Sequence, residues 1–242
     1  MAKTLITLAV AACVGSSAAY AQQFSGGQLA IDVLGYGLED DVLEVNYSGG
    51  LEYAINRNWS IGGYYTVYDF DTFDGSAGNL TLHAIYHLND DTSVGVFRAG
   101  DGIELDGFGA GRGMTGIEAG YETGAFEVEG FIGFFDKPED DDQADNALLF
   151  GLSGAYEIND TISVLASYSR ADSDTLTANR FSVGGSYEFI AGPSVYANVG
   201  RADSGLEDAS FIGLGASIEF GADRGMTFES RSLFDTINAD FE

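Results

Sequence analysis

A short unit returns along the chain at intervals of 31 to 35 residues. It consists of an aromatic residue or Ile, usually an acid, and usually an apolar residue, followed by a tight polar turn. The copies are Tyr53-Ala54-Ile55, Tyr86-His87-Leu88, Tyr121-Glu122-Thr123, Tyr156-Glu157-Ile158, Tyr187-Glu188-Phe189 and Ile218-Glu219-Phe220. The interval is about the length of two strands with their connections. The unit therefore predicts a succession of β-hairpins.

Nearly every segment from Gln28 to Phe220 alternates between apolar and polar residues with a period of two, as a strand with two different faces does. This pattern predicts twelve strands and no domain boundary. They are expected at 28–37, 41–55, 58–70, 78–88, 92–100, 112–123, 125–136, 146–158, 161–170, 179–190, 194–201 and 209–220.

The composition of the two faces separates a membrane barrel from a soluble β-sandwich, which would also alternate. In the strand expected at 146–158, one face carries Leu148, Phe150 and Leu152, while the other carries Gly151 and Ser153. A polar face of small residues fits a concave lumen, and an apolar face bordered by aromatic residues fits lipid. We therefore predict an all-β fold, a transmembrane antiparallel up-and-down β-barrel of 12 to 14 strands, with a soluble β-protein as the alternative.

The connections alternate in length. Tight turns are expected at Asn56-Arg57, Thr123-Gly124 and Asn159-Asp160, whereas Asp101 to Gly111 and Lys137 to Asp145 are longer and rich in Asp and Gly. Bacterial outer-membrane barrels have short turns on the periplasmic side and long loops outside.

The N-terminus has the pattern of a secretory signal peptide over residues 1–21. Lys3 precedes an apolar stretch from Leu5 to Val14, and Ala19-Tyr20-Ala21 is a small-residue cleavage site. The chain's one cysteine, Cys13, lies inside this segment, so the mature protein is expected to hold no disulfide and no thiolate metal site.

The charge of the chain limits its partners. The chain contains 10 basic and 38 acidic residues, which gives a net charge of −28. Such a surface repels phosphate polymers, so we expect no nucleic-acid partner.

With these features the chain resembles the porin-like outer-membrane β-barrels of Gram-negative bacteria over about residues 24–220. The segment from Ile212 to Phe220 resembles the terminal strand by which such barrels are recognised for assembly. In that family the Phe is usually the last residue, whereas here residues 221–242 follow. They are expected to form a periplasmic tail or a plug, or to add two short strands between Met226 and Phe241.

The resemblance implies an outer-membrane location, outer-membrane lipid and lipopolysaccharide as surroundings, and passive diffusion of small hydrophilic solutes or cations. A non-conducting barrel with a structural or surface-interaction role is the alternative. The permeant solute and the oligomeric state stay open.

The acids of the repeat are expected to point inward, because the neighbouring aromatic residue faces lipid. Strand parity places these candidate pore-lining residues in the lumen: Glu52, His87, Glu118, Glu122, Glu127, Glu129, Glu157, Glu188 and Glu219. Rings of carboxylates select cations. The alternative is that these acids only hydrate the lumen. Glycine and serine at lumen positions favour a narrow open pore, which Tyr64, Phe131 and Phe211 would constrict.

Two sets of residues are candidates for the membrane interface. The tyrosines suit the boundary between water and hydrocarbon near the turns, namely Tyr53, Tyr86, Tyr121, Tyr156 and Tyr187. At the opposite end, Arg98, Arg170 and Arg201 recur before Ala and Asp, and each would either contact lipid phosphate or pair with an Asp two or three residues on.

No pattern indicates catalysis. His83 and His87 share a strand face and are expected to line the lumen. We predict no enzyme activity, no metal site and no cofactor.

Overall fold

The computed structural model describes residues 23–37, 42–71, 75–105, 108–136, 147–173, 177–190, 192–203, 208–221 and 226–237. The expected signal peptide, residues 1–21, lies outside this part of the chain, and so does the Lys137 to Asp145 loop.

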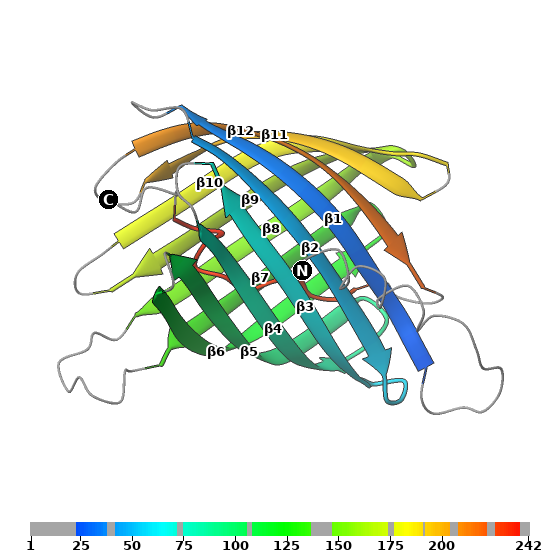
Figure 1. The fold of residues 1–242 in the computed structure, drawn as a ribbon. Helices are drawn as coiled ribbons and strands as arrows, with labels where there is room; N and C mark the ends of the chain where they lie inside the picture. The colour runs from blue at the N-terminus through cyan, green and yellow to red at the C-terminus, as the bar shows by residue number, and fades with distance from the viewer. Residues whose placement is uncertain are drawn as a thin grey trace, which may run out of the picture.

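Twelve antiparallel strands form one closed barrel, in which each strand pairs with its neighbours in sequence and β1 closes the sheet against β12 (Figure 1). The strands are β1 (Gln23–Gly37), β2 (Val42–Ala54), β3 (Trp59–Phe70), β4 (Gly75–His87), β5 (Thr92–Leu105), β6 (Phe108–Thr123), β7 (Phe126–Phe135), β8 (Leu148–Asn159), β9 (Ile162–Asp172), β10 (Thr177–Glu188), β11 (Pro193–Asp203) and β12 (Asp208–Phe220). The closed sheet confirms the predicted fold class and strand number. Closure leaves the sheet without an unpaired edge, as a membrane-spanning sheet requires.

One expected loop was wrong. The segment from Asp101 to Gly111 was predicted to connect two strands, but β5 continues to Leu105 and β6 begins at Phe108. The ladder runs on through Gly102 opposite Gly111 and Ile103 opposite Ala110. Glycine and aspartate are poor strand formers locally, and here the cross-strand hydrogen bonds outweigh that preference.

The outer face of the barrel is apolar. Leu29, Ile31 and Val33 of β1 all lie exposed on it, and the other strands contribute similar side chains. Burial of this face in the hydrocarbon of a bilayer is favourable, and the alternation of the strands turns the polar side chains inward.

A separate observation concerns helices. Among the described residues, none belongs to a helix with the length and apolarity needed to cross a membrane.

Inside the barrel, several glycines lie beneath aromatic rings of a neighbouring strand. A Cβ at Gly151 would stand 2.1 Å from the Phe131 ring, and one at Gly200 would stand 2.4 Å from the Phe211 ring. These glycines therefore make space for inward aromatic side chains, and the same Phe131 and Phe211 rings line the lumen cavity, as expected for residues that constrict it.

The chain turns back into the barrel after β12. Gly221 has a φ of 138°, and a Cβ there would lie 2.4 Å from the Gly26 backbone, so only glycine fits. Residues 226–237, called the plug below, form no strand and cross the lumen as the red segment of Figure 1. Two additional strands are absent from residues 226–237.

Two apolar clusters lie at the end of the lumen opposite the tight turns. The first includes Tyr36, Tyr68 and Phe211 together with Phe234 of the plug. The second includes Phe97, Met114 and Leu149, with Leu233 of the plug packed against it. Ile237 contacts both clusters. The plug tip, which consists of Leu233, Phe234 and Ile237, therefore joins them into one apolar layer.

Candidate functional site

The plug divides the lumen into two unlike sides. Residues 226–232 bond to inward side chains of β2, β4, β5, β6 and β7. A polar cavity stays open beside it, lined by β7 to β12 and by inward residues of β1 to β3. The site is therefore built from an occupied wall and an open wall.

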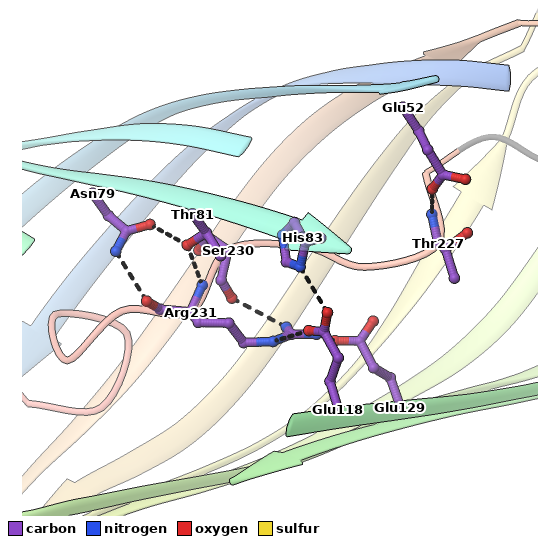
Figure 2. A network of polar contacts seen from close by, with 9 residues as sticks. All are labelled: Glu52, Asn79, Thr81, His83, Glu118, Glu129, Thr227, Ser230 and Arg231. Atoms are coloured by element: carbon purple, nitrogen blue, oxygen red, sulfur yellow. Dashed lines mark hydrogen bonds and ion pairs between the residues drawn. The ribbon is translucent and has the colours of Figure 1, made fainter. Parts of the chain in front are cut away.

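Arg231 is the central contact of the occupied wall (Figure 2). Its side chain is about 3% exposed, its Nη2 lies 2.9 Å from Glu118 Oε2 and 2.5 Å from Glu129 Oε1, and its Nε donates to Glu118 at 3.0 Å. The guanidinium group also lies over the Phe131 ring, 4.6 Å from its centroid. Two buried carboxylates and one aromatic face thus share one buried cation, which offsets part of the cost of removing these charges from water.

The backbone of Arg231 is held by β4 as firmly as its side chain is held by β6. Its N–H donates to Thr81 Oγ1 at 3.0 Å, and its carbonyl accepts from Asn79 Nδ2 at 2.9 Å. Thr81 in turn donates to Asn79 Oδ1 at 2.7 Å. His83, next along the same face, has its Nδ1 2.8 Å from Glu118 Oε1 (Figure 2). These neighbours fix the plug in one position.

Asp101 of β5 binds the start of the plug tip. Its carboxylate accepts from the Ser232 hydroxyl at 2.7 Å and from the Leu233 N–H at 3.0 Å. On the other side of the tip, Asp235 accepts from the Tyr68 hydroxyl at 2.8 Å. These contacts satisfy the polar groups at Ser232, Leu233 and Asp235 where the plug enters the apolar clusters, whereas the buried Thr236 hydroxyl has no hydrogen-bond partner among the described residues.

Near the turns, Glu52 and His87 meet the base of the plug. Glu52 accepts the Thr227 N–H at 2.9 Å and lies 3.7 Å from His87 Nε2. His87 is also bonded to Ser60 at 2.9 Å through Nε2 and to Ser93 at 2.8 Å through Nδ1. The Glu52 carboxylate is beyond hydrogen-bond distance of the imidazole, so it does not orient the ring as the acid of a catalytic triad would.

The open side of the lumen is a cavity of about 710 Å³. Serines line much of it, including Ser167 and Ser182, whose hydroxyl oxygens are 2.7 Å apart across neighbouring strands. Its described lining also contains ten carboxylates against two arginines, Arg180 and Arg231. A second cavity of about 540 Å³ continues toward the turns and shares Glu122, Glu127 and Glu219 with the first. The water-accessible lumen is therefore polar and strongly negative.

The structure separates the predicted pore-lining residues into two groups. Those that meet the plug or its anchors are buried or nearly so, namely Glu52, His87, Glu118 and Glu129. Those that line the open cavity near the turns are exposed to it, namely Glu122, Glu127, Glu157, Glu188 and Glu219. Glu122 stands directly opposite Glu127 across β6 and β7, and such like-charged pairs are mutually repulsive.

The tyrosines of the repeat lie on the outer face near the turns. Tyr53, Tyr121, Tyr156 and Tyr187 are exposed there. Tyr86 is half-buried because its ring packs against Trp59, with the centroids 4.9 Å apart.

The three arginines of the opposite rim all form ion pairs. Arg170 pairs with Asp172 at 2.7 Å. Arg98 instead binds Asp136, which follows the end of β7, and Arg201 binds Asp208 at the start of β12. The expected partner of Arg98, Asp101, is turned into the lumen instead, because its position on β5 has the opposite parity. Arg98 holds the pKa of the Asp136 carboxyl below its usual value through their hydrogen bonds.

Sequence reasoning missed Arg231, Asn79, Thr81 and Asp101. Arg231 was the one sequence signal for a lumen contact. It is a basic residue in a phenylalanine-bearing segment of a very acidic chain, and this segment follows the pattern of a terminal strand. As for metal, no group of three or more His, Cys, Asp or Glu side chains suited to an ion occurs within the described ranges.

A closed antiparallel barrel with an apolar outer face and a polar lumen defines an outer-membrane β-barrel. Residues 72–223 match the family model described as Gram-negative porin, which is more than half of the chain. The chain therefore belongs to the Gram-negative porin family, whose members reside in the outer membrane and form channels. No curated protein matches it.

Solved structures show the same fold at low sequence identity. The NanC porin matches with a TM-score of 0.58 and 11% identity, covering 78% of this chain and 98% of that one. The KdgM porin matches with a TM-score of 0.53 and 10% identity, covering 79% and 99%. A further KdgM structure, in complex with disordered oligogalacturonate, has a TM-score of 0.52 and 10% identity, with the same coverage.

Proposed function

We propose that this porin is a narrow diffusion channel that passes small hydrophilic solutes and prefers cations. The observation that carries the proposal is the charge of the open cavity, with ten carboxylates against two arginines among its described lining residues. A lumen of that sign attracts cations and repels anions through its field. The serine hydroxyls of the open wall offer neutral hydrogen-bonding partners to solutes.

The same charge argues for a solute unlike the one bound by a structural neighbour. Oligogalacturonate, named in the KdgM complex, carries a carboxylate on each sugar. A polyanion of this kind would meet repulsion along the cavity of the present chain. We propose neutral and cationic solutes small enough for the space beside the plug.

The acids near the turns provide the test of cation preference. Replacing Glu122, Glu157, Glu188 and Glu219 together with Gln should shift the ratio of cation to anion permeability toward one in reversal-potential measurements. The matched control is Asp69→Asn, which removes a carboxylate exposed on the outer face of β3. If the quadruple variant keeps the selectivity of the unaltered protein, cation preference through this group of acids is refuted.

One observation favours the alternative of a non-conducting barrel. An apolar layer around Phe234 fills part of the lumen at the end opposite the tight turns. Conductance should therefore be recorded both for the full chain and for a chain ending at Phe220, and an absence of current from both would assign the barrel a structural or surface role.

A further inference from the structure

The plug has two functional parts, an apolar tip and a charged anchor. The tip consists of Leu233, Phe234 and Ile237, which join the two apolar clusters. The anchor is Arg231 with its partners Glu118 and Glu129. The two parts are adjacent in sequence, so movement of the anchor would move the tip.

The tip lies where it interrupts the aqueous path. Around it, inward residues such as Tyr68, Ala178 and Ala202 are fully buried. Hydrated ions do not enter an apolar constriction without losing their water, and hydrophobic constrictions gate channels in this way. The cavity on the turn side ends against this layer.

The anchor depends on the pairing of buried charges and on a few single hydrogen bonds. Arg231 neutralises two carboxylates that would otherwise be buried next to each other without a cation. Most of its remaining partners are single hydrogen bonds to side chains of β4, such as Thr81 and Asn79. A second acid of the plug, Glu229, lies among lumen acids including Glu129 and is held by one long hydrogen bond from Gln28, at 3.4 Å. Repulsion between Glu229 and these acids opposes the attraction between Arg231 and its two carboxylates.

We propose that residues 226–237 are a built-in gate, with the apolar tip closing the pore and Arg231 acting as the latch that holds it closed. Opening is the withdrawal of the tip from the two apolar clusters, and it leaves the barrel wall unchanged. This inference rests on the proposed channel function and adds its regulation.

The experiment compares single-channel currents in planar bilayers from three refolded proteins. They are the full mature chain, the chain ending at Phe220, and the full chain with Arg231→Ala. Ending at Phe220 leaves an aromatic residue at the terminus of β12, as is usual in this family. The expected result is a conductance on the order of twofold or more above that of the full chain after truncation, because the open cross-section sets the current. Arg231→Ala should show intermittent openings of the same size. The control is Arg201→Ala, which removes an exposed rim arginine and should behave as the unaltered chain.

The outcomes separate the gate from the channel. Equal conductance of the full and truncated chains would overturn the gate and leave the channel standing. No current from a truncated chain whose folded state is verified by circular dichroism would overturn both. If truncation prevents folding, Arg231→Ala alone decides the matter, and channel behaviour identical to that of Arg201→Ala would refute the latch.

Discussion

The two walls of the lumen solve the problem of inward polar residues in different ways. On β4 to β6, side chains such as Asn79, His83 and Glu118 are buried and each finds a protein partner, largely on the plug. On β9 to β11, Ser163, Ser186 and Ser194 are partly exposed and line the cavity. Charged groups placed against the plug need defined partners because they have lost water, whereas the hydroxyls of the open wall retain it. The comparison teaches that the plug, and not strand parity, decides which inner residues act as structural contacts.

The strongest test of this difference between the walls is to remove one charge from the occupied wall. Glu118→Ala would leave Arg231 with Glu129 alone and His83 without its carboxylate, and breaking a buried pair of this kind costs about 3–5 kcal/mol. We expect a lower midpoint of unfolding in urea, monitored by tryptophan fluorescence in detergent micelles. Ser186→Ala on the open wall is the matched control, with an expected effect near 1 kcal/mol or less. Equal losses for the two variants would contradict the division into walls.

A bulky substitution should lower stability on the occupied wall and lower conductance on the open wall. Thr81 is fully buried beneath the Arg231 backbone, so Thr81→Trp should displace the plug and destabilise the protein by roughly 1–3 kcal/mol through overpacking. Ser186 is partly exposed to the cavity, so Ser186→Trp should find room there, leave stability nearly unchanged and narrow the path. Urea unfolding measures the first effect and single-channel conductance the second. If Ser186→Trp is the more destabilising of the two, the assignment of free space to the open wall is wrong.

The smallest effect is expected outside the lumen, at the Arg98 and Asp136 pair. Both side chains are about half exposed, and exposed ion pairs contribute at most about 1 kcal/mol. The pKa of Asp136 is lowered from 3.8 in the folded state, so its stabilising contribution is present above that value and is lost as the pH falls through the lowered pKa. The stability difference between the unaltered protein and Asp136→Asn should therefore be small at neutral pH and vanish once the pH lies below the lowered pKa. A difference that grows on acidification would contradict this assignment.

The strand pattern was readable from the sequence because it is local. Alternation with a period of two places Leu29 and Ile31 outside and Ala30 and Asp32 inside, whatever the rest of the chain does. The repeated tyrosine unit likewise marked the turns, including the Gly124 turn between β6 and β7. Strand ends were predicted less well, since β5 and β6 extend through glycines and aspartates that read as a loop.

The sequence by itself thus determined a twelve-stranded barrel with an acidic interior, since both follow from parity and composition. Only the tertiary structure decided which acids are paired, because Glu118 meets a residue 113 positions away in the chain. Strand parity treats Glu118 and Glu157 as equivalent, yet the first binds Arg231 in a buried site and the second faces the open cavity. The physical reason is that the plug desolvates one side of the lumen, and nothing in the local pattern of residues 226–237 specifies which side that is.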